Sequence, residues 1–187
     1  FGGEVAMTPS EISTGSERVG YLVKDKDVDI VVNLQGDEPL ISTNAISKAI
    51  HFLKENREVH VCTLGCPLRT EAEWKNPSVV KVVLDKYHQA IYFSRSPIPY
   101  FRDTQFNMLA SVQRHIGVYI YRKPFLMQYL QWEPGILEEQ EKLEQLRILE
   151  HGEKIQVIST RECSPGVDTP EDIPIVESLL KQRSIIS

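Results

Sequence analysis

The fold is decided by the stretch "VDIVVNLQGDEPLIS" at residues 28–42. Its valine- and isoleucine-rich part, 29–34, is typical of a buried β-strand. Gln35, Asp37 and Glu38 follow at the end of this strand, around a glycine. Because ligands in open α/β sheets bind beyond the carboxyl ends of the strands, we expect this loop to belong to a binding site.

Three further runs have the same character: "EVHVCTL" (58–64), "VVKVVLD" (79–85) and "IQVIST" (155–160). Helical patterns of apolar residues cover 43–56, 136–152 and 169–183. Ser42 or Thr43 is the expected N-cap of the first helix, Gly152 ends the second, and Thr169 caps the third. This alternation predicts an α/β domain with a mostly parallel, Rossmann-like sheet flanked by helices.

The stretch 87–134 differs from the rest because it is rich in aromatic residues and broken by prolines. It contains "HIGVYIY" (115–121), which alternates like a half-buried strand. It is either a decorated edge of the same sheet, or an insertion that forms a substrate wall or a subunit interface. No linker or repeat separates it, so we treat 1–187 as a single domain.

Composition excludes several classes of function. The chain has 187 residues, of which 41% are hydrophobic and 25% charged, with a formal net charge of −5. The negative balance argues against a nucleic-acid binder, and no apolar run reaches the roughly 18 residues of a membrane span. Three cysteines without a C-x-x-C pair indicate neither a disulfide framework nor a zinc site, so a reducing compartment is expected.

Two acidic loops, "QGDEP" (35–39) and "GVDTPED" (166–172), each follow a predicted strand. Taken alone, Asp37 is more simply a turn residue and Asp168 part of a capping turn. Together they place two carboxylates at one rim of the sheet, where water and phosphate oxygens could complete the shell of a Mg²⁺ ion. The pair therefore favours a metal–nucleotide site.

The segment "STGSERVGYL" (13–22) is open to two interpretations. Its small residues would let backbone amides at a helix N-terminus approach an anion or a base carbonyl. The spacing fits equally a capping box, with Ser13 or Thr14 as the cap and Ser16 or Glu17 as its partner. From the spacing alone, the capping box is the better interpretation.

Several other polar residues have ordinary explanations beside functional ones. On a strand, His115, Gly117 and Tyr119 share one face; a histidine there is usually a hydrogen-bonded core residue, but it could bind a sugar acid. Arginines 95 and 102 suit carboxylate or phosphate, yet surface arginines are common. The helical pattern around residues 144 and 145 is explained by good helix formers.

Seven motifs, in order along the chain, resemble the sugar-acid cytidylyltransferases, and within them the group that activates 3-deoxy-manno-octulosonate (KDO). The motifs are "TGSER" (14–18), "VVNLQGDEP" (31–39), "NPSVVKVVLD" (76–85), "YFSRSPIPY" (92–100), "RHIGVYIYR" (114–122), "LEQLRIL" (143–149) and "GVDTPED" (166–172). The resemblance covers essentially the whole chain. It implies a nucleotidyltransferase fold and the reaction of CTP with KDO to give CMP-KDO and diphosphate, for lipopolysaccharide biosynthesis.

The resemblance also implies roles for single residues. Asp37 and Asp168 would be catalytic, as ligands of a Mg²⁺ cofactor. The KDO pocket would be lined by Gln35, Arg95, Arg102, His115, Tyr119, Glu144 and Gln145. The nucleotide would lie against Thr14, Gly15, Ser16 and Arg18, although threonine is expected at position 16. The resemblance further implies a cytoplasmic homodimer, with the contact and part of the sugar site in 87–134.

One part of the family pattern is not found in this sequence. Family members begin with a strand and a loop bearing glycine, arginine and lysine, which wraps the triphosphate of CTP. From this, and from Phe1 at the start, we expect the sequence to be a fragment that lacks an N-terminal segment. The alternatives are a nucleotidyltransferase for another sugar, sialic acid or a hexose phosphate, and an inactive domain of the same fold.

Overall fold

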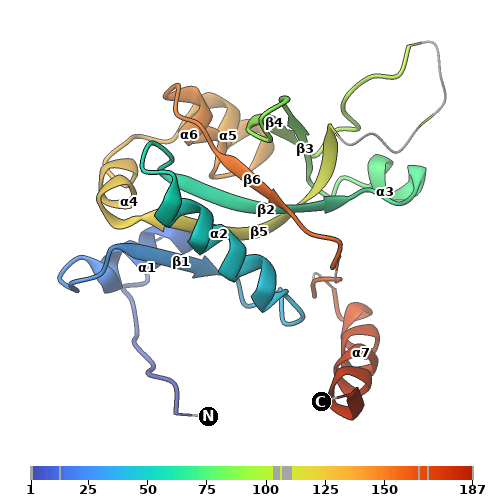
Figure 1. The fold of residues 1–187 in the computed structure, drawn as a ribbon, viewed down its shortest axis with the longest axis horizontal. Coiled ribbons are helices and arrows are strands. Elements are labelled where there is room, and N and C mark those ends of the chain that lie inside the picture. Colours follow the sequence, from blue (N-terminus) through green and yellow to red (C-terminus); the bar gives the residue numbers. More distant parts are fainter. Residues whose placement is uncertain are drawn as a thin grey trace.

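The computed structural model describes residues 2–12, 14–102, 106, 111–163, 165–167 and 169–186, with only the backbone of 183–186. In this part of the chain a mixed sheet lies between helices (Figure 1). The elements in chain order are α1 (Gly15–Val23), β1 (Ile30–Leu34), α2 (Thr43–Glu55), β2 (Val61–Pro67), α3 (Glu71–Lys75), β3 (Lys81–Leu84), β4 (Ala90–Ser94), β5 (Val112–Arg122), α4 (Lys123–Tyr129), α5 (Ile136–Glu141), α6 (Leu146–Glu150), β6 (Gln156–Ser159) and α7 (Asp172–Ile186).

The sheet has the strand order β4-β3-β5-β2-β6, and β1 also pairs with β5. The predicted α/β class is confirmed. Four strands run in the same direction: β1, β2, β3 and β6. The first three are each antiparallel to β5, and β6 is parallel to β2. The pairing is not mostly parallel, however. Since β5 lies between these strands, only β2 and β6 form a parallel ladder within the described residues.

The expectation of a sheet edge in 87–134 holds for β4, which is an edge strand, but not for β5, which lies inside the sheet. One side of β5 pairs with β2, and its other side pairs with two short strands placed end to end. β1 faces 118–122 and β3 faces 112–114, which leaves 115–117 between them. β5 spans 11 residues, against 5 in β1 and 4 in β3, so it is long enough to hold both.

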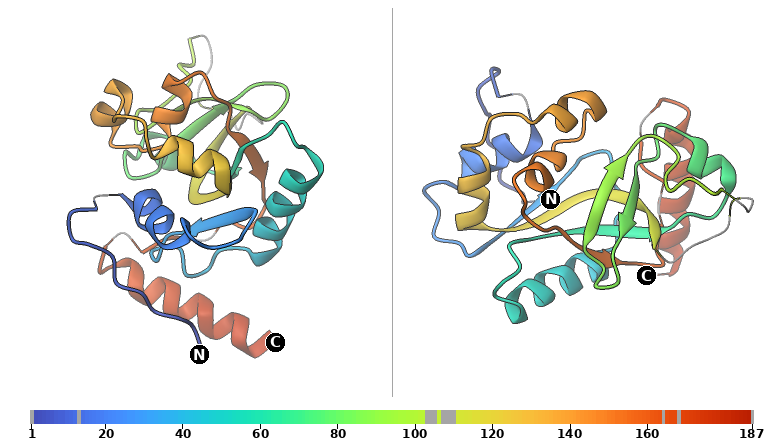
Figure 2. Two further views of the ribbon diagram at one scale, coloured as in Figure 1. Left: turned by 90° about the vertical axis from the view of Figure 1, so that its left-hand side faces the viewer. Right: turned by 90° about the horizontal axis from the view of Figure 1, so that it is seen from above.

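The two faces of the sheet carry different helices (Figure 2). Helix α2 covers one face and packs on Ile116, Val118 and Ile120. Helices α1, α4, α5 and α6 cover the other face, where Tyr119 and Tyr121 belong to the larger core cluster. The alternation of β5 thus separates the two cores, as expected for a strand.

The predicted strands and helices are largely present, with three corrections. The expected helix 136–152 is broken at Lys142, which has φ 54° in the left-handed region. Ser42 is the N-cap of α2, whereas α7 begins at Asp172, whose carboxylate accepts the backbone N–H of Thr169 at 2.8 Å. The strand β4 had no prediction, because its sequence lies within the proline-broken aromatic stretch.

The expectation that the cysteines form no disulfide is wrong. Cys66 and Cys163 form a disulfide with a Cα–Cα distance of 5.7 Å, across 97 residues of sequence. The parallel pairing of Gly65 with Ser159 brings the end of β2 next to the segment that carries Cys163. Cys62 is buried and unpaired. Of the helices that the structure describes, none has the length and apolar character needed to cross a bilayer.

Candidate active site

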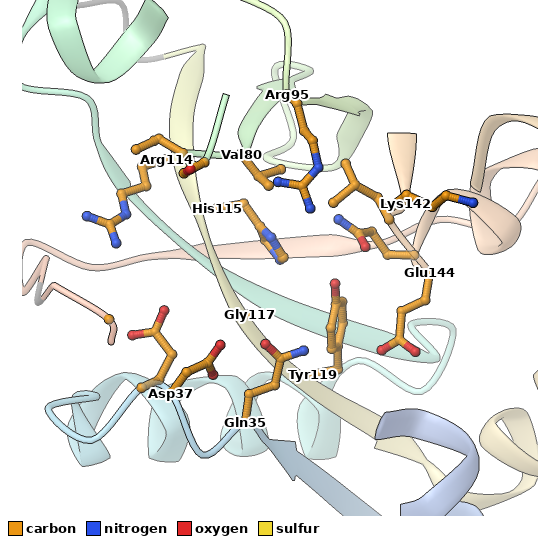
Figure 3. Close-up of a pocket in the computed structure, with 16 residues that line it drawn as sticks. Gln35, Asp37, Val80, Arg95, Arg114, His115, Gly117, Tyr119, Lys142 and Glu144 are labelled. Carbon is orange, nitrogen blue, oxygen red and sulfur yellow. The ribbon is translucent and has the colours of Figure 1, made fainter. Parts of the chain in front are cut away.

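A pocket of about 240 Å³ opens at the gap between β1 and β3 on the side of β5 (Figure 3). Its walls come from the loop after β1, the residues before β3, Arg95 after β4, the face of β5, the break between α5 and α6, and Gly166 after β6. The carboxyl ends of β1 and β6 therefore both contribute, which is where open α/β sheets bind ligands.

The pocket brings together most of the predicted sugar-site residues. Those that line it are Gln35, Asp37, Arg95, His115, Tyr119, Glu144 and Gln145. Arg102 does not line it, and neither do Thr14, Gly15, Ser16 and Arg18. Asp168 lies outside the described residues. Its neighbour Val167 is described, and its N–H donates to the backbone oxygen of Asp37 at 2.8 Å.

Asp37 and Glu38 form the acidic side of the pocket. Asp37 lies across the pocket from Arg95 and Lys142 (Figure 3). The segment after β6 is close: a Cβ on Gly166 would lie 3.1 Å from the backbone oxygen of Asp37. In the part of the chain that the structure describes, no three metal-ligating side chains converge. The oxygen donors on this side nevertheless fit the ligand preference of Mg²⁺.

His115 is held in the pocket wall as a neutral acceptor. Its Nε2 lies 2.8 Å from Thr63 Oγ1, and that hydroxyl donates to the backbone oxygen of Val118 at 2.7 Å. Because a hydroxyl has one proton to donate, Nε2–H must be the donor to Thr63, which leaves Nδ1 unprotonated. Burial lowers the pKa of His115 to about 3, so the ring carries no charge at neutral pH.

Glu144 and Gln145 present buried polar atoms that have no partner. They follow the helix break at Lys142, which turns them toward the pocket. Glu144 Oε2 and Gln145 Nε2 are buried without a hydrogen bond among the described residues. Burial raises the pKa of Glu144. A buried acceptor and a buried donor that both lack a partner are costly, and they suit a ligand with hydroxyl groups.

Three basic side chains line the pocket, those of Arg95, Arg114 and Lys142, and together they form its cationic wall. Sequence reasoning found only the first of them. Arg95 was predicted, and it is anchored by its Nε–H to the Glu141 backbone oxygen at 2.9 Å. Arg114 and Lys142 line the pocket as well but had no predicted role. Arg114 directly precedes His115 in the motif at 114–122, so that motif could have indicated it. Nothing local indicated Lys142, because the pattern around it is helical.

The N-terminus of α1 confirms the capping-box interpretation. The Thr14 hydroxyl accepts the N–H of Glu17 at 3.2 Å, and the Glu17 carboxylate accepts the N–H of Thr14 at 3.1 Å. Arg18 donates to Thr8 Oγ1 and to the Ile12 backbone oxygen at 2.6 Å. A Cβ on Gly15 would meet Asn33 at 3.7 Å. The prediction that this segment binds the nucleotide stays a prediction.

The sequence profile of the family described as Cytidylyltransferase matches residues 1–155. The chain belongs to the cytidylyltransferase family. The matched region includes every residue that lines the pocket except Gly166.

Several curated relatives of this cytidylyltransferase have the description 3-deoxy-manno-octulosonate cytidylyltransferase. The relative from Geobacter sulfurreducens is 44% identical, with 97% of this chain and 76% of the relative covered. The relative from Syntrophotalea carbinolica is 44% identical, with 97% of this chain and 75% of the relative covered. The relative from Acaryochloris marina is 42% identical, with 97% of this chain and 74% of the relative covered. These relatives confirm the predicted group within the family.

Solved structures of cytidylyl-transferring enzymes are also similar to this chain. A CMP:2-keto-3-deoxy-manno-octonic acid synthetase complexed with CTP superposes with a TM-score of 0.89 at 35% identity, covering 97% of this cytidylyltransferase and 74% of that chain. A 4-diphosphocytidyl-2C-methyl-D-erythritol synthase from Anaerococcus prevotii shares the fold, with a TM-score of 0.56 at 16% identity over 91% and 68% of the two chains.

Proposed function

We propose that the enzyme transfers CMP from CTP to KDO, giving CMP-KDO and diphosphate for lipopolysaccharide biosynthesis. The anomeric hydroxyl attacks the α-phosphorus, the new P–O bond forms as the bond to diphosphate breaks, and the hydroxyl proton is released. The relatives at 42–44% identity support this reaction over another sugar or an inactive domain. The observation that carries it is a pocket in which Glu144 Oε2 and Gln145 Nε2 are buried without a hydrogen-bond partner among the described residues. The same pocket is lined by the basic side chains of the cationic wall.

The cationic wall matches a sugar acid rather than a neutral sugar. Arg95, Arg114 and Lys142 can neutralise the KDO carboxylate, while Glu144 Oε2 accepts from a sugar hydroxyl and Gln145 Nε2 donates to another. His115, with a pKa of about 3, is too weak a base at neutral pH to take the hydroxyl proton. We assign it to holding the sugar through Nδ1.

We propose Mg²⁺ as the cofactor, held by Asp37 and Asp168. Support comes from the bond between the Val167 N–H and the Asp37 backbone oxygen, because Val167 directly precedes Asp168 in the sequence. Bound there, the ion would offset the phosphate charge that builds up during transfer. The segment Thr14, Gly15, Ser16 and Arg18 is our candidate for the nucleotide side of the site. Arg102 remains a proposed sugar contact.

We also propose a cytoplasmic homodimer. The exposed apolar side chains of Tyr87, Ile91 and Tyr100 in 87–134 support a subunit contact there. Analytical ultracentrifugation of the full-length protein tests it: a monomer at all concentrations would contradict the proposal, and Ile91→Asp is expected to favour the monomer.

The function is tested by diphosphate release from the full-length protein with Mg²⁺. CTP with KDO is expected to turn over, and replacing CTP by UTP or KDO by sialic acid is expected to lower kcat/KM at least 100-fold, on the order of a lost set of specific hydrogen bonds. Equal rates with sialic acid, or no release with any sugar, would overturn the proposal.

The role of Asp37 is tested by Asp37→Asn, with Asp27→Asn as the charge-matched control, since Asp27 is exposed and outside the pocket. We expect kcat to fall roughly 100-fold or more in the first variant, with little change in melting temperature. Equal losses of stability and rate would show that the Asp37 carboxylate is structural.

A further inference from the structure

Ser16 makes a complete set of hydrogen bonds inside the protein. Its side chain is fully buried in the first turn of α1. Ser16 Oγ donates to Glu144 Oε1 at 2.9 Å and accepts from Asn33 Nδ2 at 3.1 Å. The Tyr121 hydroxyl lies 3.3 Å away, and because the only proton of Ser16 is given to Glu144, Tyr121 must be the donor in that contact. The hydroxyl has no capacity left for a nucleotide, so the proposed nucleotide contact at Ser16 falls to its backbone.

The carboxylate that Ser16 holds is only half satisfied. Glu144 Oε1 is bound by Ser16, while Oε2 is buried with no partner among the described residues. Ser16 lies in the first turn of α1 and donates to this carboxylate. Its hydrogen bond counteracts part of the rise that burial causes in the pKa of Glu144. A negative charge at this end of a helix is also favoured by the helix dipole.

We propose that Ser16 is a positioning residue for the sugar site: its hydroxyl fixes one oxygen of Glu144, so that the other is presented to a hydroxyl group of the sugar acid. Ser16 would thereby join α1, the proposed nucleotide side, to the pocket that holds the sugar. This inference rests on the proposed function for its substrate, but the bond between Ser16 and Glu144 can be tested without turnover.

The titration of Glu144 reports on this bond directly. The other groups that face the carboxylate are Glu138 from α5, Tyr119 and Tyr121 from β5, and Tyr129 from α4, whose hydroxyl donates to the Glu144 backbone oxygen at 3.1 Å. Replacing Ser16 by alanine leaves the contacts of Glu138, Tyr119 and Tyr129 in place, but it removes the acceptor of the Tyr121 hydroxyl. The variant Tyr121→Phe controls for that change. Because the Ser16 bond favours the ionised form, its loss should raise the pKa of Glu144 further.

The experiment compares Ser16→Ala with Ser16→Thr, which keeps a hydroxyl, and with Tyr121→Phe, which removes a different hydrogen bond to the same Oγ. Carbon-13 NMR of labelled glutamate carboxyls, assigned with Glu144→Gln, follows the titration in all of them. The pKa of Glu144 is expected to rise in Ser16→Ala and to return toward the native value in Ser16→Thr. An unchanged pKa in Ser16→Ala overturns the inference, whatever the activity.

Steady-state kinetics then test the positioning. In Ser16→Ala we expect the KM for KDO to rise about tenfold, as for a lost hydrogen bond to a charged group, with the KM for CTP within about twofold. The acid limb of the pH profile should move to higher pH, and Ser16→Thr should restore both. A KM for KDO that does not change, or one that Ser16→Thr fails to restore, overturns the positioning role. A wild-type protein inactive with KDO overturns the proposed function instead, which the NMR result does not depend on.

Discussion

Because Gly117 has no side chain, the end of the Gln35 side chain has room in the pocket. A Cβ at position 117 would lie 2.7 Å from Gln35 Oε1 and 3.2 Å from its Cδ. The atoms that it would displace belong to the end of a flexible side chain, so the backbone of β5 can stay in place. A side chain at this position should therefore move Gln35 without unfolding the sheet.

We predict that Gly117→Ala raises the KM for KDO by roughly three- to tenfold, as expected when one neutral hydrogen bond is misplaced. The melting temperature should change little. Gly36→Ala is the matched control, since its Cβ would meet no atom within 4 Å. A large loss of stability with unchanged KM would contradict this account of Gly117. Steady-state kinetics and a thermal melt decide between the two outcomes.

The buried His115 makes stability depend on pH. Its ring packs edge-on to Phe93 at 5.0 Å, and burial lowers its pKa from 6.5 to about 3. Between these values the unfolded chain binds a proton that the folded chain does not, so stability falls as the pH falls through this window.

Replacing His115 by glutamine should remove this slope. Between pH 7 and pH 5 we expect the wild type to lose about 2 kcal/mol more of unfolding free energy than His115→Gln, because each unit below a pKa of 6.5 is worth about 1.4 kcal/mol. Urea unfolding at the two pH values measures the difference. His51→Gln, on the exposed face of α2, is the control, and parallel curves for His115→Gln and the wild type would refute the prediction.

At the scale of elements, short runs of valine and isoleucine predicted β1, β2, β3 and β6, because burial on both faces selects those residues. The position of β5 could not be predicted in the same way. Its alternation indicates a strand with two unlike faces, but the choice of neighbours depends on pairings between residues far apart in the sequence, such as Thr63 with Tyr119. Local sequence carries no information about that pairing.

The break between α5 and α6 shows tertiary contacts overriding helix propensity. The sequence around Lys142 is made of good helix formers. The carboxylate of Glu141, at the end of α5, accepts from Ser94 Oγ and from the Arg95 N–H at 2.9 Å. These bonds tie the end of α5 to the residues after β4. They explain why Glu144 and Gln145 reach the pocket, which a continuous helix pattern does not predict.

Lys81 holds together the pocket wall formed by the 78–80 segment and Arg95, through its ammonium group. The side chain is fully buried at the start of β3, and Nζ donates to the backbone oxygens of Asn76 at 3.0 Å and of Val79 and Arg95 at 2.6 Å. Burial lowers its pKa to about 8. One side chain thus connects the segment before β3 with the end of β4, and both segments line the pocket.

We predict that Lys81→Met lowers the unfolding free energy by about 2–4 kcal/mol, because the partly buried carbonyls of Val79 and Arg95 lose the ammonium donor. It should also lower kcat/KM, since the walls at Val79 and Arg95 lose their common anchor. Lys86→Met, at an exposed lysine stacked on Tyr87, should do neither. If Lys81→Met were as stable as the wild type in urea, the three hydrogen bonds would carry no net stability.

For the molecule as a whole, the site depends on segments that meet only in the folded chain. The residues that line the pocket come from positions 35 to 166. Family motifs predicted seven of them, and the geometry adds Arg114, Lys142 and the 78–80 segment. Residues that hold the pocket together, such as Lys81 and Ser16, are less visible in the sequence, because a buried lysine or serine has no local pattern of its own.

The disulfide ties one of these segments to the sheet. Cys66 is fully buried at the end of β2, and its bond to Cys163 fixes the chain three residues before Gly166, which lies against Asp37. A crosslink that closes a loop of this length reduces the freedom of the unfolded chain and typically contributes about 2–4 kcal/mol. A cytoplasmic setting would favour the reduced pair, so stability should depend on redox conditions.

We therefore predict that dithiothreitol lowers the unfolding free energy of the wild type by about 2–4 kcal/mol, and leaves Cys163→Ser unaffected. Cys62 supplies an internal reference: it is buried and unpaired, and burial raises its pKa to about 12, so it should react only after denaturation. Thiol titration in denaturant should then find one thiol per chain before reduction and three after it. Three thiols in protein purified without reductant, or equal responses of the wild type and Cys163→Ser to reduction, would show that the bond does not form in solution.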